Sequence, residues 1–324
     1  MLIDVHAHCF PKPYMEELKR YYQGTQRIQP RALEWEGSEE RMAFMDDLGI
    51  DVQVLSLSVP NVYVDDIELS KSLARISNDA IADICQKNPD RFLGLASVPL
   101  DNINGAIDEL DRAINELGLE GVFLGTNVNG RPLSDDRYLP FFEELNKRKT
   151  LAVLHPMDAI GDELMPEDYH QCNLQSIVGR MFSTTRIISH MIFKGTFERY
   201  PDLTFVLPHS GGAIPFLYPR WDMVYRLGPA GNPVKNLPHP PSYYLKKHYF
   251  DSALSFYHTS VRSTVDLCGI DRYVFGTDSP FANAVVKEEI EQMESFGFTD
   301  EEKEKICHLN ALNIFPKLRE NNFH

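Results

Sequence analysis

Leu2-Ile3-Asp4-Val5-His6-Ala7-His8 opens the sequence with a short apolar run that ends in two histidines. In a doubly wound α/β sheet, the turn after the first strand is normally rich in glycine, because glycines let the backbone approach a phosphate group. Here that turn reads His6-Ala7-His8 instead. The stretch therefore favours a (β/α)8 barrel, in which polar residues at the carboxyl ends of the strands carry the chemistry.

Further β-rich apolar runs follow along the chain, and helical patterns lie between them. Several runs are almost wholly apolar, which is typical of parallel strands buried on both faces. The expected strands are Leu2–Val5, Val52–Ser58, Phe92–Val98, Leu119–Leu124, Leu151–Leu154, Leu203–Leu207, His248–Asp251 and Arg272–Phe275. The expected helices are Ser38–Leu48, Ile67–Gln86, Ile103–Leu117, Tyr138–Lys149, Ser176–Tyr200, Ala213–Arg226, Thr259–Leu267 and Val285–Phe296. This alternation predicts a single (β/α)8 barrel domain over residues 1–324, with a small insertion at about residues 9–37.

The composition is that of an ordinary globular protein, with 43% hydrophobic and 24% charged residues, which excludes wholesale disorder and fibrous repeats. Asp and Glu (47) outnumber Lys and Arg (32), so the net charge is −15. Such a surface repels nucleic-acid phosphates and anionic membranes, so we expect neither as a partner. A small molecule is the expected ligand, and an anionic one needs a local cationic pocket.

The cysteines are odd in number and scattered, and they form no CxxC pair, so the sequence predicts reduced thiols and a cytoplasmic location. No apolar stretch approaches the ~18 residues that a membrane helix needs. The five cysteines are Cys9, Cys85, Cys172, Cys268 and Cys307.

Four expected strands deliver a histidine or an aspartate to the same rim of the barrel. His6 and His8 lie two apart on the first strand, so their imidazoles point to the same face. His155 and Asp278 follow the fifth and eighth strands and complete an N3O ligand set. That set suits Zn²⁺ with one open coordination position, although Mn²⁺ is also possible. His209 follows the sixth strand; the alternative interpretation is that all five are ordinary polar residues at strand ends.

The fourth expected strand ends in Leu124-Gly125-Thr126, without a lysine that could be carboxylated to bridge two metals. The sequence therefore predicts a site for one divalent ion. Two further residues are considered for substrate binding. Phe281 can line a site for an aromatic substrate, with core packing as the alternative, and Asp251 is a minor candidate for orienting a ligand.

Several motifs together resemble the amidohydrolase superfamily, and more narrowly its decarboxylases of the aminocarboxymuconate semialdehyde decarboxylase type. The similarity runs from residue 2 to about Phe315. The motifs are Asp4-Val5-His6-Ala7-His8-Cys9-Phe10-Pro11, Met45-Asp46-Asp47-Leu48-Gly49-Ile50, Phe197-Glu198-Arg199-Tyr200-Pro201, Pro208-His209-Ser210-Gly211-Gly212-Ala213, Gly276-Thr277-Asp278-Ser279-Pro280-Phe281 and Asn310-Ala311-Leu312-Asn313-Ile314-Phe315.

The resemblance implies residue roles and an activity. His6, His8, His155 and Asp278 would bind the metal ion, usually zinc, and His209 would handle protons. Arg41 would hold a carboxylate of the substrate; the alternative is a solvated helix residue. The implied activity is non-oxidative decarboxylation of a small aromatic or unsaturated carboxylic acid, in a homodimer or homotetramer.

Three alternatives share the same residues. A hydrolase would attack a lactone or amide carbonyl, with Asp278 receiving the proton. A hydratase would act on an oxo-dicarboxylate. A non-catalytic binding barrel would use the metal only to tie strands together.

Overall fold

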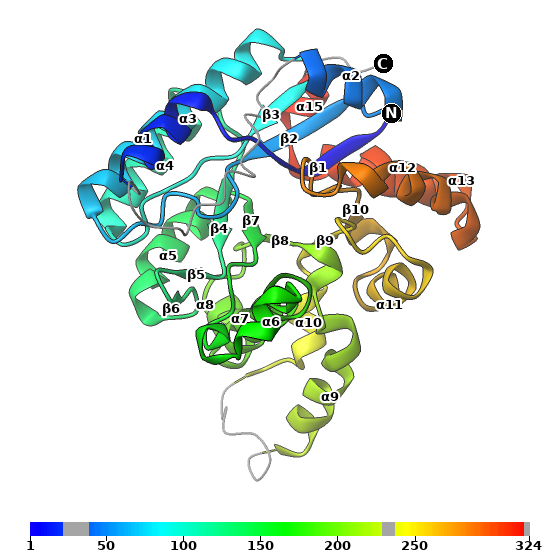
Figure 1. Cartoon of the computed structure of the whole chain (residues 1–324). Helices are drawn as coiled ribbons and strands as arrows, with labels where there is room; N and C mark the ends of the chain where they lie inside the picture. Colours follow the sequence, from blue (N-terminus) through cyan, green and yellow to red (C-terminus); the bar gives the residue numbers. More distant parts are fainter. Residues whose placement is uncertain (22–38, 229–236, 321–324) are drawn as a thin grey trace. The chain divides into compact units, whose positions relative to one another are not determined.

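The computed structural model describes residues 1–21, 39–228 and 237–320, and its internal contacts divide these residues into two compact units. Unit 1 comprises residues 1–123 and 274–324, and unit 2 comprises residues 124–273, apart from the gaps just given. Each unit is built from parallel strands and helices (Figure 1). The class is therefore α/β in both units.

Unit 1 contains a parallel sheet of three strands, β1 (Ile3–His8), β2 (Val52–Ser56) and β3 (Phe92–Gly94), in that order. Every residue of these strands is buried, as expected for parallel strands covered on both faces. The helices of unit 1 are α1 (Lys12–Tyr21), α2 (Glu39–Leu48), α3 (Ile67–Lys87), α4 (Ile103–Asn115), α12 (Asn283–Gln292), α13 (Asp300–Glu304), α14 (Asn310–Ile314) and α15 (Lys317–Glu320).

Local sequence explains where the helices of unit 1 begin and which face they bury. Helix α3 begins after Asp66, whose side chain accepts hydrogen bonds from two backbone N–H groups of the first turn. Asn102 caps α4 in the same way, through Gly105 N. Helix α4 then buries Ala106, Leu110 and Ala113, whose spacing of four and three places them on one face.

The five-stranded sheet lies mostly in unit 2, with the order β10-β9-β8-β7-β4. Its strands are β4 (Val122–Gly125), β7 (Ala152–His155), β8 (Phe205–Leu207), β9 (Tyr249–Asp251) and β10 (Tyr273–Val274). Strands β7, β8 and β9 pair in parallel, with Val206 opposite Tyr249. The helices of unit 2 are α5 (Leu139–Arg148), α6 (Glu167–Gln171), α7 (Arg180–Phe193), α8 (Thr196–Arg199), α9 (Ile214–Arg226), α10 (Pro241–Leu245) and α11 (His258–Cys268).

All eight expected strands are present, but two local features differ from the sequence prediction. The helix expected over Ser176–Tyr200 is interrupted at Gly195, whose φ of 81° no helix accommodates. A short antiparallel hairpin, β5 (Asn127–Val128) with β6 (Arg131–Pro132), follows β4. The expected insertion at residues 9–37 contains helix α1, while residues 22–37 lie outside the described part of the chain. The single domain over residues 1–324 stays a prediction.

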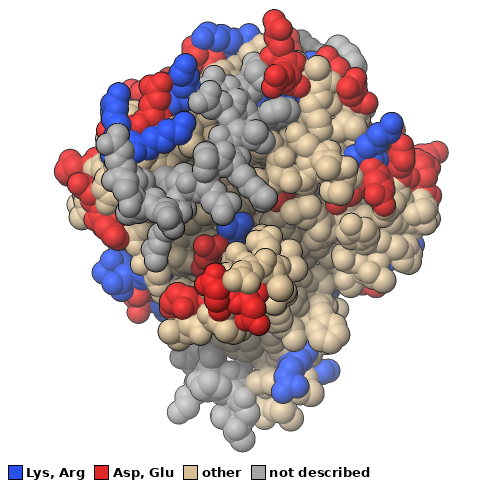
Figure 2. All heavy atoms as spheres, in the orientation of Figure 1, with Lys and Arg blue, Asp and Glu red and all other residues tan. Residues whose placement is uncertain are grey.

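Charged side chains of both signs are interspersed on the face drawn in Figure 2, with acidic groups in several clusters. This distribution agrees with the net charge of −15. Because an acidic surface does not attract anions, an anionic ligand needs a local cationic site. Within the described ranges, no helix is long and apolar enough to cross a membrane. None of the five cysteines, all of which lie in the described ranges, forms a disulfide bond.

His248 is a fully buried histidine in unit 2. Its ring packs against Phe197 and Phe205, with centroids 4.4 and 5.8 Å away, and its Nδ1 accepts a hydrogen bond from Phe205 N at 3.3 Å. Burial, helped by the nearby charges of Lys247 and Arg272, lowers the pKa of this imidazole from 6.5 to about 3. The folded protein therefore holds His248 neutral across the physiological range.

We expect His248 to make the protein acid-sensitive. Between pH 6.5 and 3 the unfolded chain binds a proton on this imidazole and the folded chain does not, so stability falls as the pH falls. The loss from this group is about 2 kcal/mol at pH 5 relative to neutral pH. Urea unfolding at pH 7 and pH 5 measures it. His248→Asn keeps an acceptor for Phe205 N without titrating, so its stability should fall less than that of the wild type. Equal acid sensitivity of the two proteins would show that other groups are responsible.

Candidate functional site

Strand β1 of unit 1 presents His6 and His8 side by side. The two residues lie two apart on a strand and share a face, and their Nε2 atoms are 3.1 Å apart. The pairing of β1 with β2 shifts register between Asp4 and Ala7. An irregularity of this kind in a strand pair changes the direction of the side chains next to it. Both histidines are buried, at 2% and 0% exposure.

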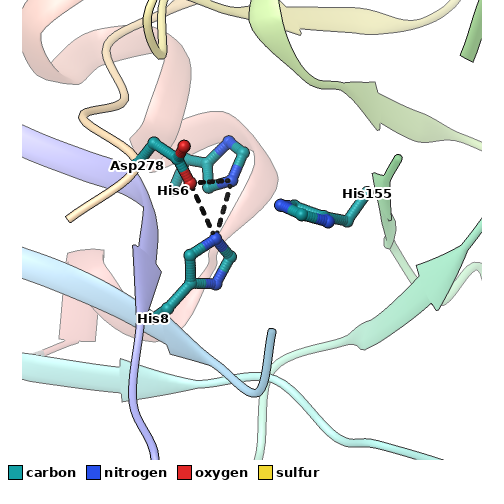
Figure 3. A group of neighbouring side chains, drawn as sticks. All are labelled: His6, His8, His155 and Asp278. Carbon is teal, nitrogen blue, oxygen red and sulfur yellow. Dashed lines mark hydrogen bonds and ion pairs between the residues drawn. The ribbon is translucent and has the colours of Figure 1, made fainter. Parts of the chain in front are cut away.

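Asp278 joins the two histidines from the segment that follows β10. Its Oδ1 lies 3.0 Å from His8 Nε2 and 3.5 Å from His6 Nε2 (Figure 3). Backbone hydrogen bonds from Asp278 N to His6 O and from His8 N to Ser279 O fix this segment along β1. Asp278 has a φ of 60°, a left-handed conformation that is uncommon for a non-glycine residue and is often found at functional sites.

Ser56 determines which nitrogen of His8 faces the other two ligand atoms. The Ser56 hydroxyl donates to the carbonyl of Ala7, which can only accept. The same oxygen lies 3.0 Å from His8 Nδ1, so it accepts the proton of that nitrogen. His8 therefore keeps the lone pair of Nε2 for a ligand, which is the arrangement that metal-binding histidines commonly show.

Asp4 connects the strand that carries His6 and His8 to the segment that carries Asp278. Its carboxylate accepts hydrogen bonds from His6 N, Thr277 N, Thr277 Oγ1 and Gln53 Nε2, at 2.7 to 3.0 Å. Burial raises the pKa of the Asp4 carboxyl to about 6, although the hydrogen bonds act in the opposite direction. Sequence reasoning did not single out this residue. Its signal was a lone carboxylate in an otherwise apolar strand, two residues before His6.

Arg41 of α2 is also fully buried in unit 1. Its guanidinium donates to Gln53 Oε1 at 2.8 Å and to the carbonyl oxygen of His8. Burial lowers the pKa of Arg41 to about 10, so the side chain is still charged at neutral pH. The alternative of a solvated helix residue is wrong, because Arg41 has no exposed surface. Its contact with a substrate carboxylate stays a prediction, and the structure adds a supporting contact to His8.

Replacing Arg41 by methionine should destabilise the protein and weaken metal binding. The acceptors on Gln53 and His8 would lose a buried donor, at a cost of about 3 kcal/mol in total, and metal affinity should fall by roughly 10-fold or more. Urea unfolding and metal titration measure both effects. Arg20→Met, at an exposed ion pair with Glu17, is the control and should leave both unchanged. A higher KM with stability and metal content intact would instead favour the substrate contact.

Phe281 lies beside the histidines of unit 1. Its ring centroid is 5.7 Å from that of His8 and 5.9 Å from that of Phe10, and about half of the residue is exposed. The alternative interpretation, that Phe281 packs in the core, is therefore wrong. A half-exposed aromatic ring beside His8 is compatible with an aromatic ligand, and the substrate contact stays a prediction.

Unit 2 places His155 and His209 next to each other. His155 ends β7 and His209 follows β8, and their ring centroids are 6.0 Å apart. His209 Nδ1 lies 2.9 Å from the carbonyl of Ala253, which can only accept, so Nδ1 carries the proton. Nε2 is then the atom that can exchange a proton with a ligand. His209 also borders a pocket of about 470 Å³ lined largely by serine and threonine residues.

The structure thus brings together His6, His8 and Asp278 in unit 1, and His155 and His209 in unit 2. The joining of these two sets into one site stays a prediction.

A model of the family described as amidohydrolase matches residues 3–317, nearly the whole chain. The chain belongs to the amidohydrolase family. This amidohydrolase is similar to 2-amino-3-carboxymuconate-6-semialdehyde decarboxylase of Dictyostelium discoideum, with 32% identity covering 96% of this chain and 90% of the relative. It is 29% identical to gamma-resorcylate decarboxylase of a Rhizobium species, covering 86% of each chain.

Among solved structures, the amidohydrolase resembles 5-carboxyvanillate decarboxylase of Novosphingobium aromaticivorans, which was solved with manganese and 4-hydroxy-3-methoxy-5-nitrobenzoic acid. The TM-score is 0.86, with 24% identity, and the match covers 98% of this chain and 96% of the other. This likeness confirms the predicted fold, a (β/α)8 barrel. The predicted superfamily, and the resemblance to its decarboxylases, are confirmed as well.

Proposed function

We propose that this amidohydrolase is a metal-dependent, non-oxidative decarboxylase of a small aromatic or unsaturated carboxylic acid. One observation carries the proposal. In a chain of this family, His6 Nε2, His8 Nε2 and Asp278 Oδ1 all lie within 3.5 Å of one another in a buried position. The type of reaction is inferred from the named relatives, which are decarboxylases of such acids.

The donor set of unit 1 fits one divalent ion. Two imidazole nitrogens and one carboxylate oxygen converge, and the Ser56 contact leaves His8 Nε2 ready to coordinate. We propose His155 as the further ligand, because in a (β/α)8 barrel the ends of all strands meet at one rim. Three imidazoles with one carboxylate favour zinc. The manganese in the solved relative makes that ion the alternative.

The reaction replaces the carboxylate of the substrate by a proton. When bound, a divalent ion supplies positive charge that holds and polarises an oxygen of the substrate. His209 would first take up a proton from solvent on Nε2 and then deliver that proton to the carbon that bears the carboxylate, which returns the imidazole to the form protonated at Nδ1. The bond from that carbon to the carboxylate then breaks, carbon dioxide leaves, and the bonding electrons restore the unsaturated system. Phe281 would pack against the substrate, and Arg41 would hold its carboxylate.

The test is a substrate panel assayed with purified protein of known metal content. Hydroxybenzoates and muconate semialdehydes are monitored for carbon dioxide, and lactones and amides for acid release. Oxo-dicarboxylates with an unsaturated bond are monitored for loss of that bond. We expect carbon dioxide from at least one acid and no turnover of the other classes. Hydrolysis or hydration without release of carbon dioxide would overturn the proposal.

The identity of the metal is tested separately. The protein is stripped with a chelator and reconstituted with zinc or manganese, and one ion per chain is expected at full activity. Activity restored by manganese alone would contradict the choice of zinc and leave the decarboxylase proposal standing. A homodimer or homotetramer also stays a prediction, which light scattering after gel filtration measures.

A further inference from the structure

Asp251, the last residue of β9, is fully buried, and one of its carboxylate oxygens accepts hydrogen bonds from two backbone N–H groups. Its Oδ1 accepts hydrogen bonds from His209 N at 2.8 Å and from Ala253 N at 3.1 Å. The first of these residues follows β8, and the second follows β9. One carboxylate oxygen therefore connects the loops after two neighbouring strands.

The two hydrogen bonds place the acceptor that orients His209. Holding Ala253 N fixes the peptide chain of Ala253, whose carbonyl accepts the proton of His209 Nδ1 at 2.9 Å. Three hydrogen bonds thus connect Asp251, Ala253 and His209 in a closed ring, and the imidazole of His209 is part of that ring. These contacts have one consequence for chemistry, namely that Nδ1 carries the proton of the neutral imidazole and Nε2 is its basic nitrogen.

The backbone at His209 needs such support. His209 and Ser210 have φ values of 52° and 55°, and the two glycines that follow are also left-handed. Each non-glycine residue in this region costs on the order of 1 kcal/mol or more. A side chain at Gly212 would meet the carbonyl oxygen of Met181 at 2.4 Å, so the loop is closely packed on that side. The hydrogen bond from His209 N to Asp251 Oδ1 helps to offset the strain.

We propose that Asp251 is a positioning residue for His209, which sets the orientation and the tautomer of its imidazole so that Nε2 exchanges the proton. The inference rests on the proposed function of His209. It assigns Asp251 no contact with the substrate or the metal. What the role requires is an acceptor oxygen at the place of Oδ1, and the negative charge itself is not required.

This requirement distinguishes two conservative variants. Asp251→Asn keeps an acceptor oxygen at the same distance from the backbone and loses the charge. Asp251→Glu keeps the charge and displaces the oxygen by one methylene group. We expect the asparagine variant to retain kcat within a few-fold of the wild type. The glutamate variant and Asp251→Ala should lose 10-fold to 100-fold in kcat, with KM within about twofold and one metal ion per chain. Asp271→Ala, at an exposed position, is the control.

The tautomer of His209 is read directly by NMR of protein labelled with ¹⁵N-histidine, with a His209→Asn sample for assignment. Wild type and Asp251→Asn should show a single form protonated at Nδ1, and Asp251→Glu should show a mixture. A glutamate variant more active than the asparagine variant would overturn the proposal, since it would show that the charge is needed. An unchanged tautomer in the glutamate variant would overturn it as well. The NMR result does not depend on turnover, so failure of the proposed reaction remains distinguishable.

Discussion

Replacing His8 by alanine should empty the metal site and lower turnover by about 10³-fold or more. His8 Nε2 is the central donor of unit 1, 3.1 Å from His6 Nε2 and 3.0 Å from Asp278 Oδ1. Its removal leaves one imidazole and one carboxylate in that unit, too few to hold an ion against a chelator. Metal analysis of the purified variant and the rate of carbon dioxide release measure the two effects.

A matched substitution separates loss of the metal from general damage. His239 is an exposed histidine of unit 2 that stacks on Tyr243, with centroids 3.9 Å apart. His239→Ala should bind one ion per chain and turn over at the rate of the wild type. If His8→Ala also retained one ion per chain and full activity, the cluster of His6, His8 and Asp278 would not be the metal site.

The sequence was sufficient to predict the elements that carry the site, because two simple patterns are visible in it. Parallel strands buried on both faces appear as short apolar runs, and all eight runs form strands. Residues two apart on a strand share a face, so the pairing of His6 with His8 was predictable, and their Nε2 atoms do meet.

The residues that support the site could not be predicted in the same way, because tertiary contacts determine them. Arg41 is a candidate through the resemblance alone, for a substrate carboxylate, and nothing in the sequence indicates its buried hydrogen bonds to Gln53 and to the carbonyl of His8. His and Asp adopt the left-handed region more often than most other non-glycine residues, but nothing in the sequence shows where they do so, and the left-handed backbone at His209 and Asp278 was therefore not predictable. These departures from local rules lie beside the predicted chemistry, where strain is commonly found.

Replacing His209 by alanine should abolish turnover while the metal remains bound. The proposed step needs a proton donor whose second nitrogen is fixed, and His209 meets this need through Nδ1 and the carbonyl of Ala253. Removing a positioned acid or base commonly costs 10²-fold to 10⁴-fold in rate, and we expect a fall in kcat of about 10³-fold. Three quantities are measured on the same preparation: the rate of carbon dioxide release, the metal content, and the exchange of the product's ring hydrogen in D₂O.

The hydrogen exchange decides what His209 does. If it delivers the proton, the wild type incorporates deuterium at the carbon that lost the carboxylate, and His209→Ala catalyses neither this exchange nor decarboxylation. His190→Gln is the control within unit 2, because His190 contacts Ser134 through Nδ1, and this variant should retain both activities. Wild-type rates in His209→Ala would exclude the proton role. Loss of the metal together with turnover would instead make His209 a ligand, and the acid would then have to be another group near the substrate carbon.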